Sequence, residues 1–293
     1  MTLLLSVLEQ GMIYAVMALG VYITYKILDF PDLTVDGSFP MGAAITAVLI
    51  SKDANPLLAL LISGLAGAAA GCLTGLIHVK LKVRDLLSGI IMMTALYTVN
   101  LRIAGKANLP IYNKDTMFDN GLIRGLIPDQ LYPYRTAVIL LAVMLAAKYL
   151  LDWYMNTSSG YLLRAVGDND TLLTSLGVNK GLVKIAGLSI ANALVALSGS
   201  LFAQQQRYFD ASMGTGTMVV GLASVIIGIS LFQKRSFLRV TSRVAAGAVL
   251  YKACVAIAIR YMKSVDLKLV TASLFLVILV LGRERKRKVK ECA

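Results

Sequence analysis

The feature that most constrains this chain is a series of long apolar runs that fill most of its length. Several windows hold about 20 mostly apolar residues, enough for a helix to cross a bilayer core of roughly 30 Å. Of 293 residues, 57% are hydrophobic and 15% are charged, whereas a soluble domain carries about 25% charged residues. Because a backbone in hydrocarbon must satisfy its own hydrogen bonds, the sequence predicts an all-α, polytopic membrane protein.

We expect about 8–10 transmembrane helices, some of them discontinuous, in a single transmembrane domain over residues 1–293. The first run continues past Asp29 without an A-x-A-like cleavage site, which favours a retained span over a signal peptide. The apolar runs cover Leu3–Leu28, Gly37–Ile50, Leu57–Val79, Leu86–Ala104, Thr136–Met155, Val183–Phe202, Met218–Phe232, Val244–Ile259 and Leu267–Leu281.

Two of the runs are too short for a full span, and each follows a polar stretch. Asp29–Ser38 (DFPDLTVDGS) precedes one, and Asp210–Thr217 (DASMGTGT) precedes the other. Polar, broken backbone at membrane depth is tolerated only where protein or a water-filled cavity satisfies its amide groups. Discontinuous helices of this kind often mark a transport path. The alternative is that each polar stretch is an exposed loop.

The net charge of +13 is concentrated beside apolar spans. The tail, residues 283–293, and the loop Phe232–Arg243 hold much of the excess, which is the pattern that places basic segments in the cytoplasm. This distribution argues against nucleic-acid binding and favours contact of the tail with anionic lipid. Alternation of the spans then puts Lys80–Asp85 and Thr157–Gly181 in the cytoplasm, with Met1 and Lys106–Arg135 outside.

No enzyme motif is visible. A phosphate-binding loop, a G-x-S-x-G elbow and an H-E-x-x-H pair are all missing from the sequence. The three cysteines suggest no disulfide framework, and the single histidine, His78, excludes a histidine-rich metal cluster within one chain. We therefore expect no catalytic residue, no metal and no cofactor on this chain, so uphill transport would need an ion gradient or a partner.

Gly67, Gly71 and Gly75 recur every four residues in the third run. Small residues on one helix face let two backbones approach closely in lipid. We expect this face to pack against another helix of the same chain, with a dimer seam as the alternative.

The polar segment TSSGYLLRAVGDNDTLLTSLGVNKG, Thr157–Gly181, is patterned like a short amphipathic helix between two apolar spans. Such a helix lies in the lipid interface or docks its apolar face into a partner. Arg164 is outnumbered by Asp168 and Asp170, which favours docking over an anionic lipid surface. We expect Leu163 and Val166 to enter a groove on a partner protein.

The same segment resembles the coupling segment of ATP-binding-cassette importer permeases of the branched-chain amino acid and ribose family. The matching positions are Thr157, Gly160, Arg164, Ala165, Gly167, Asn169, Gly177 and Val178. The first span with its break, Gly11–Ala47, and the Ala- and Gly-rich span Ile185–Gln204 are similar to the family in the same order. Two departures are Asp36 within the break and Ile229 where the family commonly has a second glycine.

The resemblance implies an inner-membrane importer subunit that works by alternating access. It implies two separate ATPase subunits, which bind ATP and Mg, an extracytoplasmic substrate-binding protein, and pairing with a second copy or a paralogue. It also implies a coupling contact with the ATPase formed by Gly160, Leu163, Arg164, Ala165, Val166, Gly167, Asp168, Asn169, Leu176 and Gly177.

Polar side chains within the spans are candidates for the substrate path, because they are costly in hydrocarbon and face a cavity or another helix. Met92, Met93 and Tyr97 suit an apolar or aromatic substrate. With the resemblance, this favours an amino acid, aromatic or branched; sugars and nucleosides are the other solutes the family implies. The candidates are Glu9, Tyr14, Asp36, Ser38, Met92, Met93, Thr94, Tyr97, Asn100, Asn192, Ser198, Ser200 and Gln204.

Two other functions are open from the residues. An ion-coupled secondary transporter would use Glu9 or Asp36 as a membrane-embedded relay and would contain inverted repeats, which are not evident. A membrane scaffold without transport would leave the broken helices unexplained.

Overall fold

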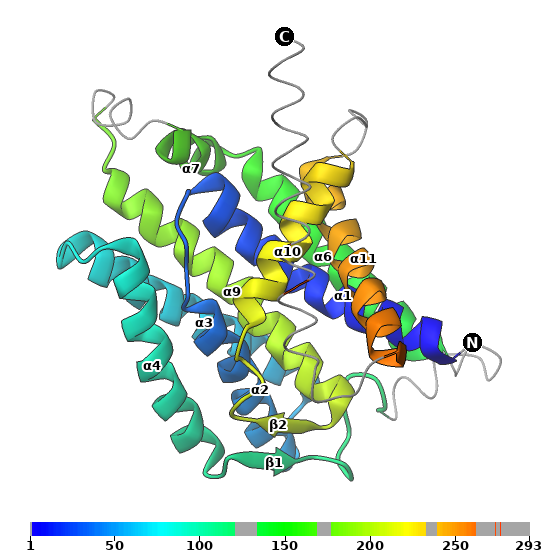
Figure 1. The fold of residues 1–293 in the computed structure, drawn as a ribbon. Helices are drawn as coiled ribbons and strands as arrows, with labels where there is room; N and C mark the ends of the chain where they lie inside the picture. Colours follow the sequence, from blue (N-terminus) through cyan, green and yellow to red (C-terminus); the bar gives the residue numbers. More distant parts are fainter. Residues whose placement is uncertain are drawn as a thin grey trace.

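The computed structural model describes residues 2–120, 134–168, 177–232, 239–261, 273 and 276. Within them the chain is helical apart from one short hairpin (Figure 1). The helices are α1 (Thr2–Tyr22), the π-helix η1 (Ile23–Ile27), α2 (Val35–Ser51), α3 (Pro56–Lys80), α4 (Asp85–Ala104), α6 (Arg135–Met155), α7 (Ser158–Asp168), α9 (Lys180–Gln206), α10 (Thr217–Leu231) and α11 (Val240–Tyr261). The strands β1 (Asn108–Pro110) and β2 (Tyr208–Asp210) pair antiparallel.

The prediction of an all-α polytopic membrane protein is confirmed. Six helices in the described part are long and apolar enough to span a membrane, and α2 and α10 are shorter apolar helices. Both short helices coincide with the runs expected to be discontinuous. The run Leu267–Leu281 and the basic tail fall outside the described residues, apart from two isolated positions.

Small residues hold α9 at the centre of the bundle, against α1, α2 and α3. A Cβ on Gly67 or Gly71 of α3 would overlap the carbonyl oxygens of Asn192 and Leu188 in α9. The glycine-lined face of α3 therefore packs within one chain, as expected, because only residues without a side chain allow backbones this close.

The two ends of the bundle carry different secondary-structure elements (Figure 1). The short helix α7 lies at one end, here called the α7 end, where α6 finishes and α9 begins. The β1–β2 hairpin lies at the opposite end, here called the hairpin end. It joins the chain after α4 to the chain after α9, with Leu109 opposite Phe209. The two ends of the bundle thus present different surfaces.

The break between the first two spans is shorter than the sequence suggested. The π-helix η1 ends at Ile27 and α2 begins at Val35, so the irregular segment is residues 28–34. Asp36 and Ser38, expected within the break, are instead in the first turn of α2. The aspartate is compatible with helix there, because a carboxylate is favourable at a helix N-terminus.

Candidate functional site

The two short helices start beside each other inside the bundle, and Asp36 joins them. Its carboxylate accepts hydrogen bonds from the Gly216 and Met218 amides, at 3.0 and 2.7 Å, and from the Thr217 hydroxyl, at 2.9 Å. These groups form the first turn of α10, where amides have no partner within the helix. Asp36 of α2 is therefore an N-terminal cap for α10, supplied from 180 residues away in sequence.

A second aspartate anchors the segment that leads into α2. Asp32 is 1% exposed and accepts hydrogen bonds from Asn192 Nδ2, at 2.7 Å, and the Thr34 amide, at 2.9 Å. Asn192 Oδ1 in turn accepts from the Ser38 hydroxyl at 2.7 Å. Thr34 also shares a hydrogen bond with Thr74 of α3. A buried network with its members bonded in this way fixes one backbone arrangement.

Asn100 of α4 completes the surroundings of the α2 start. Its Nδ2 donates to the Gly37 carbonyl at 3.0 Å, whereas its buried Oδ1 has no hydrogen-bond partner among the described residues. The structure thus brings together four of the predicted path residues, Asp36, Ser38, Asn100 and Asn192.

The remaining path candidates lie elsewhere. Thr94 and Tyr97 are exposed on α4, and Thr94 bonds only to carbonyls of its own helix. Met92 packs with Met41 and Leu96, and the half-buried Met93 lies near Gly37. The buried Ser198 hydroxyl donates a hydrogen bond to the Ile13 carbonyl of α1. The buried Ser200 hydroxyl accepts one from the Thr46 hydroxyl of α2. Glu9 accepts from Gln205, Gln204 bonds the Met117 amide, and Tyr14 stacks on Phe39.

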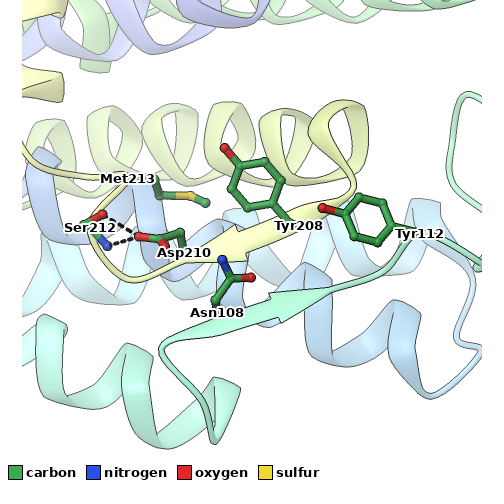
Figure 2. A pocket seen from close by; sticks show the side chains of 6 residues that line it. All are labelled: Asn108, Tyr112, Tyr208, Asp210, Ser212 and Met213. Atoms are coloured by element: carbon green, nitrogen blue, oxygen red, sulfur yellow. Dashed lines mark hydrogen bonds between the residues drawn. The ribbon is translucent and has the colours of Figure 1, made fainter. Parts of the chain in front are cut away.

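A pocket of about 430 Å³ opens at the hairpin end. Figure 2 shows Tyr112 and Tyr208 at one end of the pocket and Ser212 and Asp210 at the other. Asp210 Oδ1 accepts from the Ser212 amide at 2.7 Å, which fixes the turn after β2. The volume is in the range that holds a small ligand, and its aromatic and acidic sides suit a ring and a positively charged group. The full lining is Asn108, Tyr112, Tyr208, Asp210, Ser212 and Met213.

At the α7 end, Thr157 and Gly160 set the angle between α6 and α7. The Thr157 hydroxyl accepts from the Gly160 amide at 3.4 Å and donates to the Tyr154 carbonyl at 2.7 Å. A Cβ on Gly160 would overlap that same carbonyl. The spacing T-x-x-G is thus a helix cap followed by a position with no room for a side chain.

The expectation that Leu163 and Val166 enter a partner's groove is wrong. Leu163 is 0% exposed and Val166 3% exposed, in the main core of this chain. A Cβ on Gly187 of α9 would meet the Leu163 side chain, and one on Gly167 would overlap the Ile27 carbonyl. The amphipathic pattern was correct, but the apolar face of α7 packs against its own bundle, because η1 and α9 supply the apolar surface.

The opposite face of α7 carries its exposed side chains, among them Tyr161, Arg164 and Asp168. Arg164 lies over the Tyr161 ring, 6.0 Å from its centre. Ala165 is half-buried, and Gly177 has a left-handed backbone with φ of 71°. Asn169 and Leu176 lie outside the described residues.

Sequence reasoning missed Asp32 and Thr217. Asp32 is inside the quoted polar stretch, so its position at membrane depth was a usable signal. Thr217 and the Asp36 cap had no such signal, because the pairing joins distant segments.

Among the described residues, no group of three or more side chains could hold a metal ion.

Comparisons with known proteins agree with this architecture. A family model described as branched-chain amino acid transport system / permease component matches residues 3–281. A tyrosine transport system permease protein of Clostridioides difficile (strain R20291) is 45% identical over 280 residues, 95% of this chain and 91% of that protein. The ribose import permease protein RbsC of Escherichia coli (strain K12) is 26% identical over 229 residues, 77% of this chain and 68% of that protein. No solved structure matches the chain.

Proposed function

This chain belongs to the family of branched-chain amino acid transport system permease components, and from that premise we propose that it carries an aromatic amino acid, tyrosine, into the cell. It is a permease subunit of an ATP-binding-cassette transport system and a multi-pass protein of the inner membrane. The observation that carries the substrate proposal is the 45% identity, over 95% of the chain, to a tyrosine transport system permease.

The pocket at the hairpin end supports this substrate. Tyr112 and Tyr208 offer ring faces to an aromatic side chain, and Asp210 offers a carboxylate to an α-ammonium group. We assign the hairpin end to the outer face, where an extracytoplasmic binding protein delivers its ligand. The substrate then passes the start of α2, where Asp36, Asn100 and Asn192 meet.

Energy enters at the α7 end, in this proposal, through contact with two ATPase subunits that bind ATP and Mg. The surface available for that contact is the exposed face of α7, with Tyr161, Arg164 and Asp168, rather than its buried apolar face. The segment 157–181 is thus the coupling segment. A second copy of this chain supplies the other half of the permease, as the family's pairing implies.

Reconstitution tests the function directly. Vesicles containing this chain, its ATPase and its binding protein should accumulate labelled tyrosine only with ATP, and should continue when a protonophore collapses the proton gradient. Excess ribose should leave uptake unchanged. Accumulation driven by a proton or sodium gradient alone would instead identify a secondary transporter, and Glu9→Gln would then be the first variant to examine.

The coupling contact is tested with a pair of α7 variants. Arg164→Glu should abolish the ATP hydrolysis that substrate stimulates while leaving the chain folded, because Arg164 is exposed. Leu163→Asp should instead destabilise the chain itself, since a carboxylate would be buried in the core. Stimulation that is normal in Arg164→Glu would place the contact elsewhere.

Sidedness is tested by labelling single cysteines in whole cells. A reagent that cannot cross membranes should label Asn113→Cys at the hairpin end and should leave Ser159→Cys of α7 unlabelled, although both positions are exposed. The reverse pattern would invert the assignment of the two faces.

A further inference from the structure

Lys252 lies deep within a membrane span. It is the thirteenth residue of α11, which runs from Val240 to Tyr261. At 1.5 Å per residue, its Cα is roughly 18 Å from one end of the helix and roughly 13 Å from the other. Lysines near the end of a span usually extend along the helix toward the lipid headgroups, but the Lys252 ammonium group lies over an aromatic ring of the bundle instead.

The side chain turns into the bundle. Its Nζ lies 3.4 Å from the centre of the Tyr14 ring of α1. Tyr14 stacks on Phe39 of α2, with ring centres 5.9 Å apart, and meets Phe202 of α9 edge-on at 6.0 Å. Four helices thus converge on one ammonium group and three rings. An aromatic face attracts a cation but leaves its charge without a counter-ion.

A second lysine inside a span, Lys148, has a carboxylate partner. Lys148 of α6 forms an ion pair with Asp152, one turn along the same helix, at 3.6 Å. Among the described residues, no ion pair or hydrogen bond involves Lys252. Glu9, the carboxylate of α1, accepts a hydrogen bond from Gln205 and not from Lys252. At the preceding residue, Tyr251, the buried hydroxyl also has no hydrogen-bond partner among the described residues.

An unpaired ammonium group in a low-dielectric site is costly unless an anion arrives to share it. We propose that Lys252, placed over the Tyr14 ring, binds the carboxylate group of the transported amino acid during its passage. The assignment rests on the proposed function and adds to it the residue that recognises the carboxylate. A carboxylate would gain a charge-assisted hydrogen bond from the ammonium group, which the Tyr14 ring holds in position.

Ligand-induced stabilisation of the full chain in lipid nanodiscs tests the proposal. Tyrosine and 3-(4-hydroxyphenyl)propionate, which keeps the carboxylate but lacks the amine, should raise the melting temperature. Tyramine, which lacks the carboxylate, should not. Lys252→Met should weaken the apparent affinity for both acids about tenfold or more, whereas Lys252→Arg should retain most of it. The matched control is Lys114→Met, which removes an exposed lysine paired with Asp53.

A second measurement needs no variant. Acylation of Lys252 by an amine reagent, followed by mass spectrometry on the wild-type chain, should slow when tyrosine or the propionate is present and should not respond to tyramine. Lys114 is the internal reference. The proposal is overturned if both acids stabilise Lys252→Met as they do the wild type, if neither acid protects Lys252, or if chloride alone produces the lysine-dependent effects.

The outcome is separable from that of the proposed function. If wild-type vesicles take up tyrosine but Lys252 does not respond to carboxylates, the Lys252 site is wrong and the proposed function is retained. Vesicles that fail to take up tyrosine would remove the function. A Glu9→Gln change that restores stability lost in Lys252→Met would show that the two charges pair structurally, and would also overturn the proposal.

Discussion

The two short helices, α2 and α10, begin side by side but are secured in different ways. The start of α2 is fixed by buried groups from its neighbours: Asn192 bonds Ser38, and Asn100 bonds the Gly37 carbonyl. The start of α10 follows a glycine-bearing turn, with φ of 84° at Gly216, and its amides depend on Asp36 of α2. The start of α2 is thus anchored to several helices of the bundle, whereas the start of α10 takes its cap from α2 and the body of α10 packs against α11 and α1.

The two helices also differ in how closely one glycine of each approaches its neighbour. A Cβ on Gly42 of α2 would overlap the Ala196 carbonyl oxygen in the backbone of α9. A Cβ on Gly221 of α10 would meet the side chain of Val21, 2.7 Å from Cγ2. Backbone cannot yield without moving a helix, whereas a side chain can change rotamer. The difference is confined to these positions, because farther along α10 a Cβ on Gly228 would overlap the Arg243 carbonyl oxygen in the backbone of α11.

The largest effect is expected from the backbone contact of α2. Gly42→Ala should lower the free energy of unfolding by about 3 kcal/mol, because α2 and α9 would have to separate. Gly221→Ala, the matched change in α10, should cost under about 1 kcal/mol. Thermal unfolding of the two purified variants measures both values, and equal losses would show that Gly221 has as little room for a side chain as Gly42.

Removing the cap that joins the helices should have an intermediate effect. Asp36→Ala leaves three donors at the α10 start without their acceptor and should cost about 2 kcal/mol. Asp53→Ala, which breaks an exposed ion pair with Lys114, should cost less than about 1 kcal/mol. Unfolding measurements compare the two. If Asp36→Ala is no worse than its control, α10 does not depend on α2 for its start.

A smaller loss is expected from one bond of the α2 anchor. Ser38→Ala should destabilise the chain by about 1 kcal/mol, since Asn192 keeps its bonds to Asp32 and the Leu188 carbonyl. Ser51→Ala is the control, because the Ser51 hydroxyl bonds only within its own helix. Identical melting temperatures for the two variants would show that the Ser38–Asn192 bond does not anchor α2.

The subtlest test concerns access and not stability. Ser38 is 0% exposed in this structure. If the α2 start borders the transport path, Ser38→Cys should nevertheless react with a small water-soluble thiol reagent in at least one nucleotide state, with Thr215→Cys, at an exposed position of the turn before α10, as a positive control. Protection of Ser38→Cys in every state would assign Ser38 to packing alone.

Much of the architecture could be predicted, because in a bilayer the length and apolar composition of a segment are nearly sufficient to locate a transmembrane helix. Predicted and observed helix ends agree within about four residues in the described chain, as at Leu57–Val79 and the observed Pro56–Lys80. The four-residue glycine spacing correctly predicted a close helix contact. The segment around Thr157 and Gly160 was recognisable because cap and close-contact positions are local properties of sequence.

The sequence by itself thus determined that the chain lies in a lipid bilayer, where its spans are, which two helices are interrupted, and the family. Only the tertiary structure decided which way α7 faces, since periodicity marks an apolar face without saying whether a partner or the chain's own core covers it. It also decided that Asp36 caps α10 and that Lys252 reaches Tyr14. Thr94 and Tyr97, in contrast, lie on the exposed face of α4. These contacts join residues up to 238 positions apart, from Tyr14 to Lys252, and no local pattern specifies a contact between segments that meet only after the helices pack.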